Sequence, residues 1–600
     1  MRALLFTVII CLLVHPLFAQ HLLGKVVSVH AQNEPLASVL NQLSKTGNFQ
    51  FSYKSDIVLQ DKKISIKEEN KTVKYILDKL LEGSYHYTEK GKYIIIHAGG
   101  ERFFTISGFI QNGNTGERLS NVTVYEDQIL ASTLTNEQGY FKLPIKNKRQ
   151  LKTISIVVRK ESFSENVVAL NAGYDQELVL PIVPSKEVYL KDVVIKKEDE
   201  EPNWANKFFI SSKQKIQNIN IGNFMANRPI QTSLLPGIGT RGMIGSQVSN
   251  KFSFNILGGY TGGVEGLEIG TIFNINKGDV KGLQISGIFN SVSGNVKGCQ
   301  IGAIYNYVSQ NTGGVQISGI GNIVKKKTSG VQIAGISNLD LDNFRGVQIS
   351  GISNHNQGQT KGIQLAGITN INHKETKGLQ MTGFNNHCDT NIKGMQWAGF
   401  SNHARKEMKG IQMAGVYNYA RKMKGLQFGL INVADTMDGA GIGLVNIYGN
   451  GLNKLVVSSS DIQQVNIAYL SGAKKLHSII GMGANADLHN QLYSAFFGLG
   501  SSINLSQRWS LHPECYGQVY YLGDWGYVPL VGRVQLDLSY KIYQKLELFA
   551  GVSYSITENR RGTTVKDYNP WLNTSNIQYR IIDNNNLASW MGWQMGIRIF

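Results

Sequence analysis

The stretch Gly282-Leu-Gln-Ile-Ser-Gly-Ile-Phe-Asn290 is one copy of a phrase that recurs twelve times between about Gly266 and Asn446. It returns, for example, as Gly330-Val-Gln-Ile-Ala-Gly-Ile-Ser-Asn338. A fixed period of this length is the signature of a repeat architecture. The closing asparagines are spaced by sixteen residues and, in the last two intervals, by fourteen: 274, 290, 306, 322, 338, 354, 370, 386, 402, 418, 432 and 446.

The apolar positions within one unit follow neither the strict alternation of a strand nor the period of a helix. They are the residue two before the Gly and the first, third and sixth after it, as in Val331, Ile333 and Ile336. Short strands joined by glycine corners fit this spacing. We therefore expect a β-solenoid in which each coil buries its apolar face against its neighbours and in which identical amides stack in ladders. The ladder asparagines are Asn290, Asn306, Asn322, Asn338, Asn354 and Asn370.

A row of antiparallel membrane strands is the alternative, because nine residues and a seven-residue turn also repeat at sixteen. The change of parity between Ile333 and Ile336 would then place polar side chains on the lipid face, where they are costly. The solenoid is favoured for this reason. Twelve coils at a strand spacing of about 4.8 Å predict a rod of roughly 55–60 Å.

The chain has 600 residues, a formal charge of +18 and a pI near 9.4, which indicates an anionic neighbourhood. Arg2, the apolar run that follows it and Ala19 have the layout of a secretory signal peptide over residues 1–20. Lipid anchoring through Cys11 is not expected, because Cys11 lies within the apolar run. The other cysteines, Cys299, Cys388 and Cys515, are too few and too scattered for a disulfide framework or a zinc site. No later stretch is apolar for long enough to predict a membrane helix.

Residues 21–98 alternate strands and helices. Strands are expected at Val26–Val29, Ile64–Ile66 and Tyr93–Ile96. One helix is expected from Pro35 to Lys45 with Gly47 as its stop, and a second carries Val73, Ile76, Leu77 and Leu80 and stops at Gly83. The pattern resembles the secretin and TonB short N-terminal domain, and a generic small α+β domain is the alternative. The resemblance implies a contact with an inner-membrane protein of the TonB or anti-sigma system.

Residues 103–185 have an all-β composition with frequent turn signals. The runs Ile106-Ser-Gly-Phe-Ile110 and Thr135-Asn-Glu-Gln-Gly-Tyr-Phe141 carry a resemblance to the carboxypeptidase regulatory-like domain, which implies a sandwich of seven strands and no peptidase activity. A linker is expected over residues 186–250, with an acidic run at Glu198–Glu201. This order of modules resembles SusC-type outer-membrane receptors. Too few residues follow for their very large barrel, so nutrient import is not expected.

The last 150 residues show strict alternation, as in Leu530, Val534 and Leu538 against Arg533, Asp537 and Lys541. Long segments with one apolar face predict a transmembrane β-barrel, here of about eight strands. The first barrel strand is expected at residues 251–262, the repeat solenoid at 263–450, and the remainder of the barrel at 455–600. The chain as a whole is therefore predicted to be multidomain and mainly β: a small α+β domain, a β-sandwich, a β-solenoid of 16-residue repeats and a small transmembrane β-barrel.

Loop lengths predict the topology of this barrel. Residues 472–476, 506–508 and 543–545 would be short inner turns, and 558–589 a long outer loop. With a first strand before the repeats and periplasmic N-terminal domains, the repeats would fall in the first outer loop. The sequence thus predicts an outer-membrane protein with a periplasmic N-terminus and surface-exposed repeats, in contact with outer-membrane lipid.

A cation precedes the repeat Gly in eight coils. Stacked in register, these side chains would form a basic stripe suited to an anionic glycan or lipopolysaccharide, whereas nucleic acid is not an expected partner. The alternative is that they only keep the rod soluble and block edge pairing. The stripe consists of Lys281, Lys297, Arg345, Lys361, Lys377, Lys393, Lys409 and Lys424.

No catalytic constellation accompanies the repeat. Carboxylates such as Asp279, Glu375 and Glu407 fall in scattered columns, and no Ser/His/Asp set or P-loop is present. His355, His387 and His403 share a column with Tyr307 and Tyr419, so no metal site and no cofactor are expected. The phrase also resembles surface-repeat segments of bacterial cell-surface proteins. We expect a non-enzymatic surface protein for binding or adhesion, or alternatively a signalling or accessory component of an uptake system.

Overall fold

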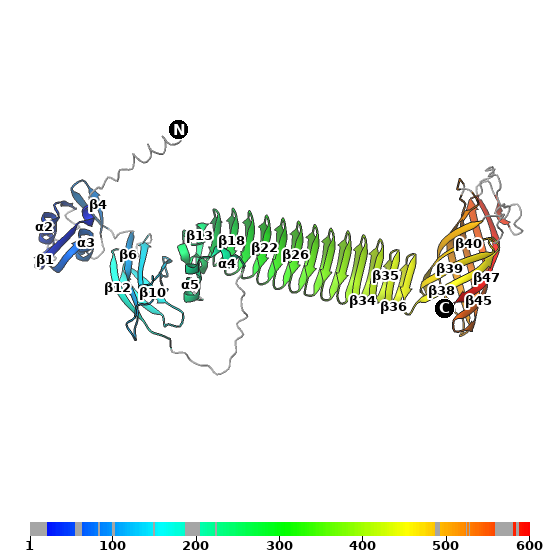
Figure 1. Cartoon of the computed structure of the whole chain (residues 1–600). Coiled ribbons are helices and arrows are strands. Elements are labelled where there is room, and N and C mark those ends of the chain that lie inside the picture. The colour runs from blue at the N-terminus through cyan, green and yellow to red at the C-terminus, as the bar shows by residue number, and fades with distance from the viewer. Residues whose placement is uncertain are drawn as a thin grey trace, which may run out of the picture. The chain divides into compact units, whose positions relative to one another are not determined.

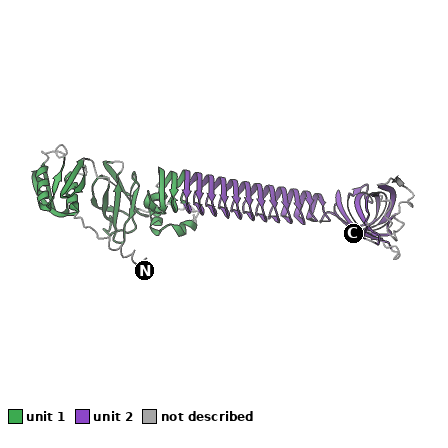
Figure 2. Ribbon diagram, turned by 90° about the horizontal axis from the view of Figure 1, so that it is seen from above, with its two compact units in different colours: residues 1–265, 275–277 green, residues 266–274, 278–600 purple. Residues whose placement is uncertain are grey.

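The computed structural model describes residues 21–53, 63–81, 85–98, 103–147, 151–185, 204–222, 225–485, 492–523, 525–526, 528–558, 580–583 and 587–599. The predicted signal peptide, residues 1–20, lies outside them. The chain divides into two units, residues 1–265 with 275–277 and residues 266–274 with 278–600 (Figure 2).

The first domain of unit 1 has the predicted α+β plan. Its apolar helix faces, including Val39, Leu43 and Ile76, form one buried core with the strands. The left-handed residue that ends the first helix is Asn48, with a φ of 51°, and not Gly47 as predicted. The predicted stop at Gly83 lies outside the described residues. The elements are η1 (Leu22–Gly24), β1 (Val26–Pro35), α2 (Leu36–Gly47), β2 (Gln50–Ser52), β3 (Lys63–Thr72), α3 (Val73–Leu81), β4 (Tyr85–Lys90) and β5 (Tyr93–Ala98), with sheets β1-β3 and β2-β5-β4.

The second domain is a sandwich of seven described strands, as predicted. One sheet has the order β11-β10-β7-β8 and the other β12-β6-β9, and β12 pairs with β6 in parallel. Inward side chains such as Ile106, Leu143 and Ile156 fill the space between the sheets. The strands are β6 (Phe103–Asn112), β7 (Thr123–Glu126), β8 (Ala131–Leu134), β9 (Tyr140–Lys146), β10 (Thr153–Arg159), β11 (Asn166–Asn171) and β12 (Gln176–Ile182).

Residues 204–250 form helices and strands, so the prediction of a linker over residues 186–250 is wrong for this part. Residues 186–203 lie outside the described ranges. Helix α5 packs on the sandwich, because Gln217 Nε2 donates to Ser132 Oγ at 2.7 Å and Ile221 joins a buried cluster with Tyr125 and Val157. Helix α5 is rich in Gln, Asn and Lys, so its amphipathic pattern is weak in the sequence. The elements are α4 (Trp204–Phe209), α5 (Ser212–Ile221), β13 (Ala226–Leu235), β14 (Ile238–Gly239) and η2 (Gly242–Gln247).

The repeat is a β-solenoid, as predicted, and the antiparallel alternative is excluded. Equivalent strands of successive coils pair in parallel and in register, for example Gln284 with Gln300 and Asn290 with Asn306 (Figure 1). The strands from β17 onward are β17 (Gly263–Gly270), β18 (Phe273–Asn276), β19 (Val280–Ser286), β20 (Phe289–Val292), β21 (Val296–Gly302), β22 (Tyr305–Val308), β23 (Thr312–Ser318), β24 (Gly321–Val324), β25 (Thr328–Ala334), β26 (Ser337–Asp340), β27 (Phe344–Ser350), β28 (Ser353–Asn356), β29 (Thr360–Ala366), β30 (Thr369–Asn372), β31 (Thr376–Thr382), β32 (Asn385–Cys388), β33 (Ile392–Ala398), β34 (Ser401–Ala414), β35 (Tyr417–Phe428), β36 (Ile431–Ile442) and β37 (Val445–Tyr448).

The predicted first barrel strand, residues 251–262, is not part of the barrel. Strands β15 (Val248–Asn255) and β16 (Gly258–Thr261) belong to the sheet of the solenoid. The alternating apolar residues Phe252, Phe254 and Ile256 are exposed on that sheet. Alternation with one apolar face is therefore present, but this face belongs to a solenoid wall and not to a barrel wall.

The barrel contains eight strands and is closed by pairing of its first and last members, for example Val457 with Ile597. The eighth strand, which the sequence did not predict, is β38, and it follows the repeats. The order around the barrel is β38-β39-β40-β41-β43-β44-β45-β47. The bounds are β38 (Leu452–Ser460), β39 (Val465–Ala473), β40 (Leu476–Ala484), β41 (Tyr493–Gly500), β43 (Trp509–Tyr521), β44 (Leu530–Tyr543), β45 (Leu546–Glu558) and β47 (Leu587–Ile599), with two short strands beside them, β42 (Ile503–Asn504) and β46 (Arg580–Asp583).

Candidate functional site: the surfaces of the solenoid

Amides fill the part of the solenoid interior where the prediction placed three of the four apolar residues of each coil. Gln332 and Asn338 have no exposed surface, whereas Ile333 and Ile336 are 36% and 42% exposed. Each Gln Nε2 donates to the Gln of the preceding coil, as from Gln316 to Gln300 at 2.7 Å. The Asn ladder was predicted correctly: Asn290, Asn306, Asn322, Asn338, Asn354 and Asn370 each donate from Nδ2 to the Asn of the following coil at 2.9 Å.

Glycine corners let the coils stack this closely. Gly346 has a φ of 139°, and a Cβ placed on it would lie 1.8 Å from the carbonyl oxygen of Gly330. The residue two before the Gly faces inward, as predicted, for example Val280 and Met408. The prediction that the first, third and sixth residues after the Gly are buried is wrong, because the in-register amides occupy the inside and satisfy one another there.

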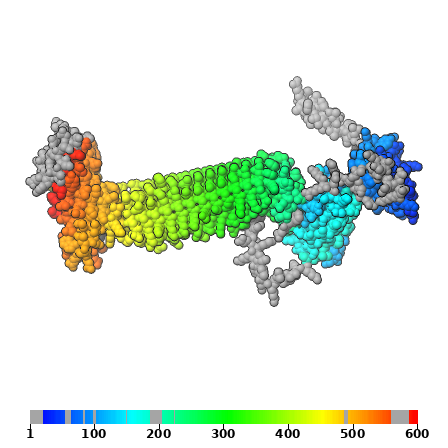
Figure 3. Space-filling view, turned by 180° about the vertical axis from the view of Figure 1, so that it is seen from behind, coloured from blue at the N-terminus to red at the C-terminus, as the bar shows by residue number. Residues whose placement is uncertain are grey.

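The outward apolar residues form three columns along the rod, which we call the apolar columns. They are the first, third and sixth residues after each corner glycine in the nine coils from Gly282 to Gly410. None of these side chains is buried, and Phe384 reaches 52% exposure. A shallow groove of about 330 Å³ lies along the third-residue column, lined by Ile349, Leu365, Met381 and Trp397 and by the small residues Ser350, Ala366 and Thr382. Figure 3 shows one face of the stacked coils, without a break from green to yellow.

The basic stripe forms, in two parts. Arg345, Lys361, Lys377, Lys393, Lys409 and Lys424 pair in register across six consecutive coils. Lys281 and Lys297 form a separate pair, because Gly313 and Ser329 occupy the intervening positions. Asp438 ends the stripe.

Carboxylates neutralise part of this charge. Glu375 Oε2 lies 3.2 Å from Lys377 Nζ and its Oε1 lies 3.3 Å from Lys393 Nζ, while Glu407 lies 3.3 Å from Lys424. The hydrogen bond from Lys377, with that from Lys393, lowers the pKa of Glu375. Among the described residues, no carboxylate pairs with Arg345, Lys361 or Lys409. These three cations are the best placed to meet an external anion.

The histidine column gathers two residues that the periodicity did not indicate. His387 and His403 stack at 4.9 Å, as the shared column predicts. Asp389, from a turn, accepts from His387 at 3.0 Å and from His373 at 2.6 Å, and His373 contacts His355 at 2.9 Å. Burial and the neighbouring charge of His373 lower the pKa of His355. Within the described ranges no group of three ligands suited to a metal ion is present.

The barrel interior combines a polar network with a buried apolar cluster that includes Leu470, Ile479 and Phe496. Arg598 Nη2 lies 2.6 Å from Asp537 and 3.0 Å from Glu514, and Gln535 donates to Glu514 at 2.7 Å. A void lined by residues of the network and the cluster is about 20 Å³, close to the volume that one water requires. The outer wall is apolar, with Val534, Leu536 and Leu538 exposed. This wall fits lipid contact, and the filled lumen fits an anchor better than a pore.

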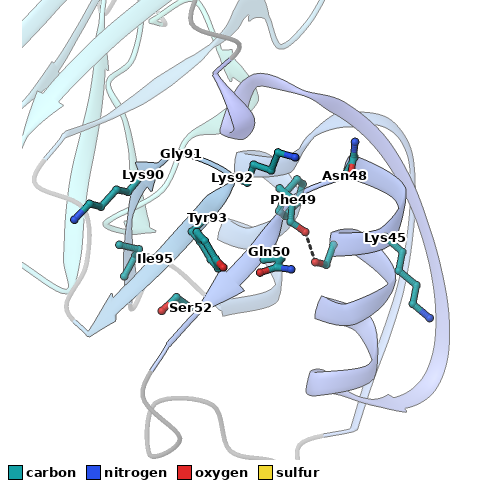
Figure 4. Close-up of a pocket in the computed structure, with 11 residues that line it drawn as sticks. Lys45, Asn48, Phe49, Gln50, Ser52, Lys90, Gly91, Lys92, Tyr93 and Ile95 are labelled. Atoms are coloured by element: carbon teal, nitrogen blue, oxygen red, sulfur yellow. Dashed lines mark hydrogen bonds between the residues drawn. The ribbon is translucent and has the colours of Figure 1, made fainter.

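The α+β domain contains a separate pocket of about 920 Å³ (Figure 4). Its lining comes from the end of α2, from β2 and from the β4–β5 turn, and it combines Phe49 and Tyr93 with Lys45, Lys90 and Lys92. No pattern in the sequence indicates this pocket, because its residues come from separate elements and belong to no motif.

The last coil of the solenoid packs against the barrel within unit 2. The backbone N–H of Asn446 donates to Ser471 Oγ at 3.0 Å, and Asn446 Nδ2 donates to Ser478 Oγ at 2.7 Å. Ser471 and Ser478 are paired across β39 and β40. Their strand neighbours Leu470 and Ile479 line the lumen, so the two serines face outward.

In the described part of the chain, no helix is both long and apolar enough to cross a membrane. Comparison with protein-family models, with curated proteins and with solved structures finds no match for this chain.

Proposed function

We propose that the protein is an outer-membrane anchor that holds the solenoid and the N-terminal domains on the periplasmic side. The chain enters the barrel at Leu452, at the barrel end where the turns after Ala473 and Tyr543 are short. Short turns mark the periplasmic end of outer-membrane barrels, and long loops the outer end. The connections at the opposite end include residues 559–579, between β45 and β46.

This orientation replaces the surface display predicted from the sequence. That prediction depended on residues 252–260 being the first barrel strand, which would have placed the repeats in an outer loop. With β38 as the first strand, the same loop-length argument favours the periplasm for everything that precedes Leu452. Binding or adhesion by the repeats then concerns periplasmic or membrane partners.

The amide-filled solenoid supports a spacer role. Every coil is fixed to the next by paired strands and by two side-chain ladders, so bending requires several buried hydrogen bonds to break at once. Such a rod can act as a stiff spacer that begins at the barrel. We propose a non-enzymatic role, because the chemistry of the solenoid is that of stacking amides.

Site-directed labelling in intact cells tests the orientation. Trp525→Cys lies in a long connection and Ser329→Cys on the solenoid, and both wild-type residues are exposed. A membrane-impermeant maleimide should label the first variant in intact cells, and the second only after the outer membrane is permeabilised. The unsubstituted protein gives the background from Cys299, Cys388 and Cys515. Rapid labelling of Ser329→Cys in intact cells would show that the repeats lie at the cell surface and would contradict the proposed orientation.

A second function, signalling to a TonB or anti-sigma protein through residues 21–98, is favoured by the pocket beside β2. Strand β2 is at the edge of its described sheet, where a partner strand can add. Deleting residues 21–98 should then abolish a transcriptional response while the barrel remains in the membrane. An unchanged response would remove this proposal.

A further inference from the structure

We propose that the apolar columns and the basic stripe together form a surface that lies against the phospholipid layer in which the barrel is embedded. This inference rests on the proposed membrane anchoring. It adds a second contact with the membrane, made by the solenoid and not by the barrel.

The apolar columns are too extensive to be incidental. At about 4.8 Å per coil and about 7 Å between alternate residues of a strand, nine coils of the first two columns cover roughly 300 Å² before the third is added. Soluble monomers rarely expose contiguous apolar patches above a few hundred Å². Because the amides occupy the interior, Ile333, Ile349 and Trp397 have no core to enter. A continuous apolar surface of this size is of the kind that often marks a binding site.

The charges beside the columns indicate what that site binds. In seven of the nine coils a cation is separated from the first apolar column by the corner glycine alone, as in Lys361, Gly362 and Ile363. An apolar strip bordered by cations matches the boundary between acyl chains and anionic headgroups. A second copy of the chain offers the same cations and no excess of negative charge. Phospholipid therefore complements the surface better than self-association does.

The contact with the barrel places one end of the rod at the membrane boundary. Asn446 covers Ser471 and Ser478 on the outer wall, and the exposed side chains Ile467 and Met482 lie on the same wall of β39 and β40. The neighbouring turn carries the exposed cations Lys474 and Lys475. The last coil thus occupies a position that lipid takes elsewhere around the barrel, and the columns of the preceding coils extend from this point.

Photo-crosslinking of the full-length protein in vesicles tests the proposal. The photoreactive residue benzoylphenylalanine replaces Ile349, in the third-residue column, or Leu339, which is half-buried on the short strand β26 as a matched control. The vesicles contain phosphatidylethanolamine with phosphatidylglycerol. Flotation first shows that the protein is anchored, so a failure of the proposed anchoring is seen separately. The assay does not depend on which way the barrel is inserted.

We expect lipid adducts several-fold more abundant at position 349 than at 339. The triple variant Ile333→Thr, Leu365→Thr and Met381→Thr should reduce the lipid adducts at position 349. The double variant Arg345→Gln and Lys361→Gln should also reduce these adducts, and more strongly in vesicles that contain phosphatidylglycerol than in purely zwitterionic vesicles. Thr preserves the strand, because these side chains face outward. A crosslinked dimer in place of lipid adducts would assign the surface to a second copy. Equal adducts at 349 and 339, or none at either in floated protein, would also overturn the proposal.

Discussion

Asn446 Nδ2 donates a hydrogen bond to Ser478 Oγ at 2.7 Å, so the Asn ladder of the solenoid ends on the outer wall of the barrel. The ladder donates toward the barrel in every coil, and Asn446 also accepts from Asn432 at 2.8 Å. The Gln ladder runs in the opposite direction and ends where Gln284 donates to the carboxylate of Glu268 at 2.7 Å. A carboxylate only accepts, which suits this terminal position. Both ladders thus finish on a suitable partner.

Asn446→Ala should loosen the attachment of the rod to the barrel. It removes the side-chain donor to Ser478 Oγ and the side-chain acceptor of Asn432 Nδ2, at a cost of about 1–3 kcal/mol for each buried group left unsatisfied, while the backbone bond to Ser471 remains. We expect faster proteolysis between Tyr448 and Leu452 in the full-length protein. Thr436→Ala, at an exposed position one coil earlier, is the control and should leave the cleavage rate unchanged. Equal rates for both variants would show that the contact does not hold the rod.

Gln316→Leu should destabilise the solenoid more than Ile317→Thr. The first change leaves Gln300 Oε1 without its donor inside the rod and leaves Gln332 Nε2 with only its 3.4 Å bond to Asp340, whereas Ile317 faces outward. We expect losses of about 2–4 kcal/mol for Gln316→Leu and under about 0.5 kcal/mol for Ile317→Thr. Pulse proteolysis in urea measures both. The reverse order would indicate a conventional apolar core.

Asp340 makes the stability of the solenoid depend on pH. Burial raises the pKa of this carboxyl to about 7, and hydrogen bonds from Thr328, Gln332 and Gln348 only partly offset the burial. A raised pKa means that the folded state retains a proton that the unfolded state loses near pH 4. The stabilisation is therefore complete below about pH 4 and is lost as the pH rises through about 7.

Asp340→Asn should remove this dependence. Asn is compatible with the position, because Asn356 and Asn372 occupy it in the next two coils. At pH 8 we expect the variant to unfold at a higher urea concentration than the parent, and the difference should shrink toward pH 5. Urea unfolding of parent and variant, measured from pH 5 to pH 8, tests this prediction. Parallel pH profiles for parent and variant would show that Asp340 does not titrate in this window.

The basic stripe should bind polyanions weakly and with strong salt dependence, because screened charge supplies most of the energy. Changing Lys361, Lys377, Lys393 and Lys409 to Gln should remove most heparin or lipopolysaccharide binding at low salt while the fold is kept. The lost ion pairs with Glu375 are exposed and contribute about 0–1 kcal/mol each. The charge-matched control makes the same change to Gln at four lysines outside the stripe, Lys325, Lys326, Lys327 and Lys406. Equal losses in both variants would mean that only net charge matters.

The periodic parts of this protein could be predicted from the order of its residues. A sixteen-residue period forces identical residues into register once the coils stack, so the solenoid and its Asn ladder follow from spacing alone. Alternation over long segments determined seven of the eight barrel strands in the same way. Local patterns likewise predicted both helices of the α+β domain and the run Ile106–Ile110 that lies in β6, whereas the number of sandwich strands came from the resemblance.

Which face of each coil lies inside depends on how the coils pack together. The alternation of residues along the strand shows that Gln332 and Ile333 lie on opposite faces, but it does not show which of them is buried. Gln332 is inside because the stacked amides of successive coils satisfy one another's hydrogen bonds. The same ambiguity assigned residues 252–260 to the barrel, because alternation fits a solenoid wall equally well. Contacts between distant segments, such as Asn446 with Ser478 or Asp389 with His373, depend on where each chain segment turns, and no local pattern contains that information.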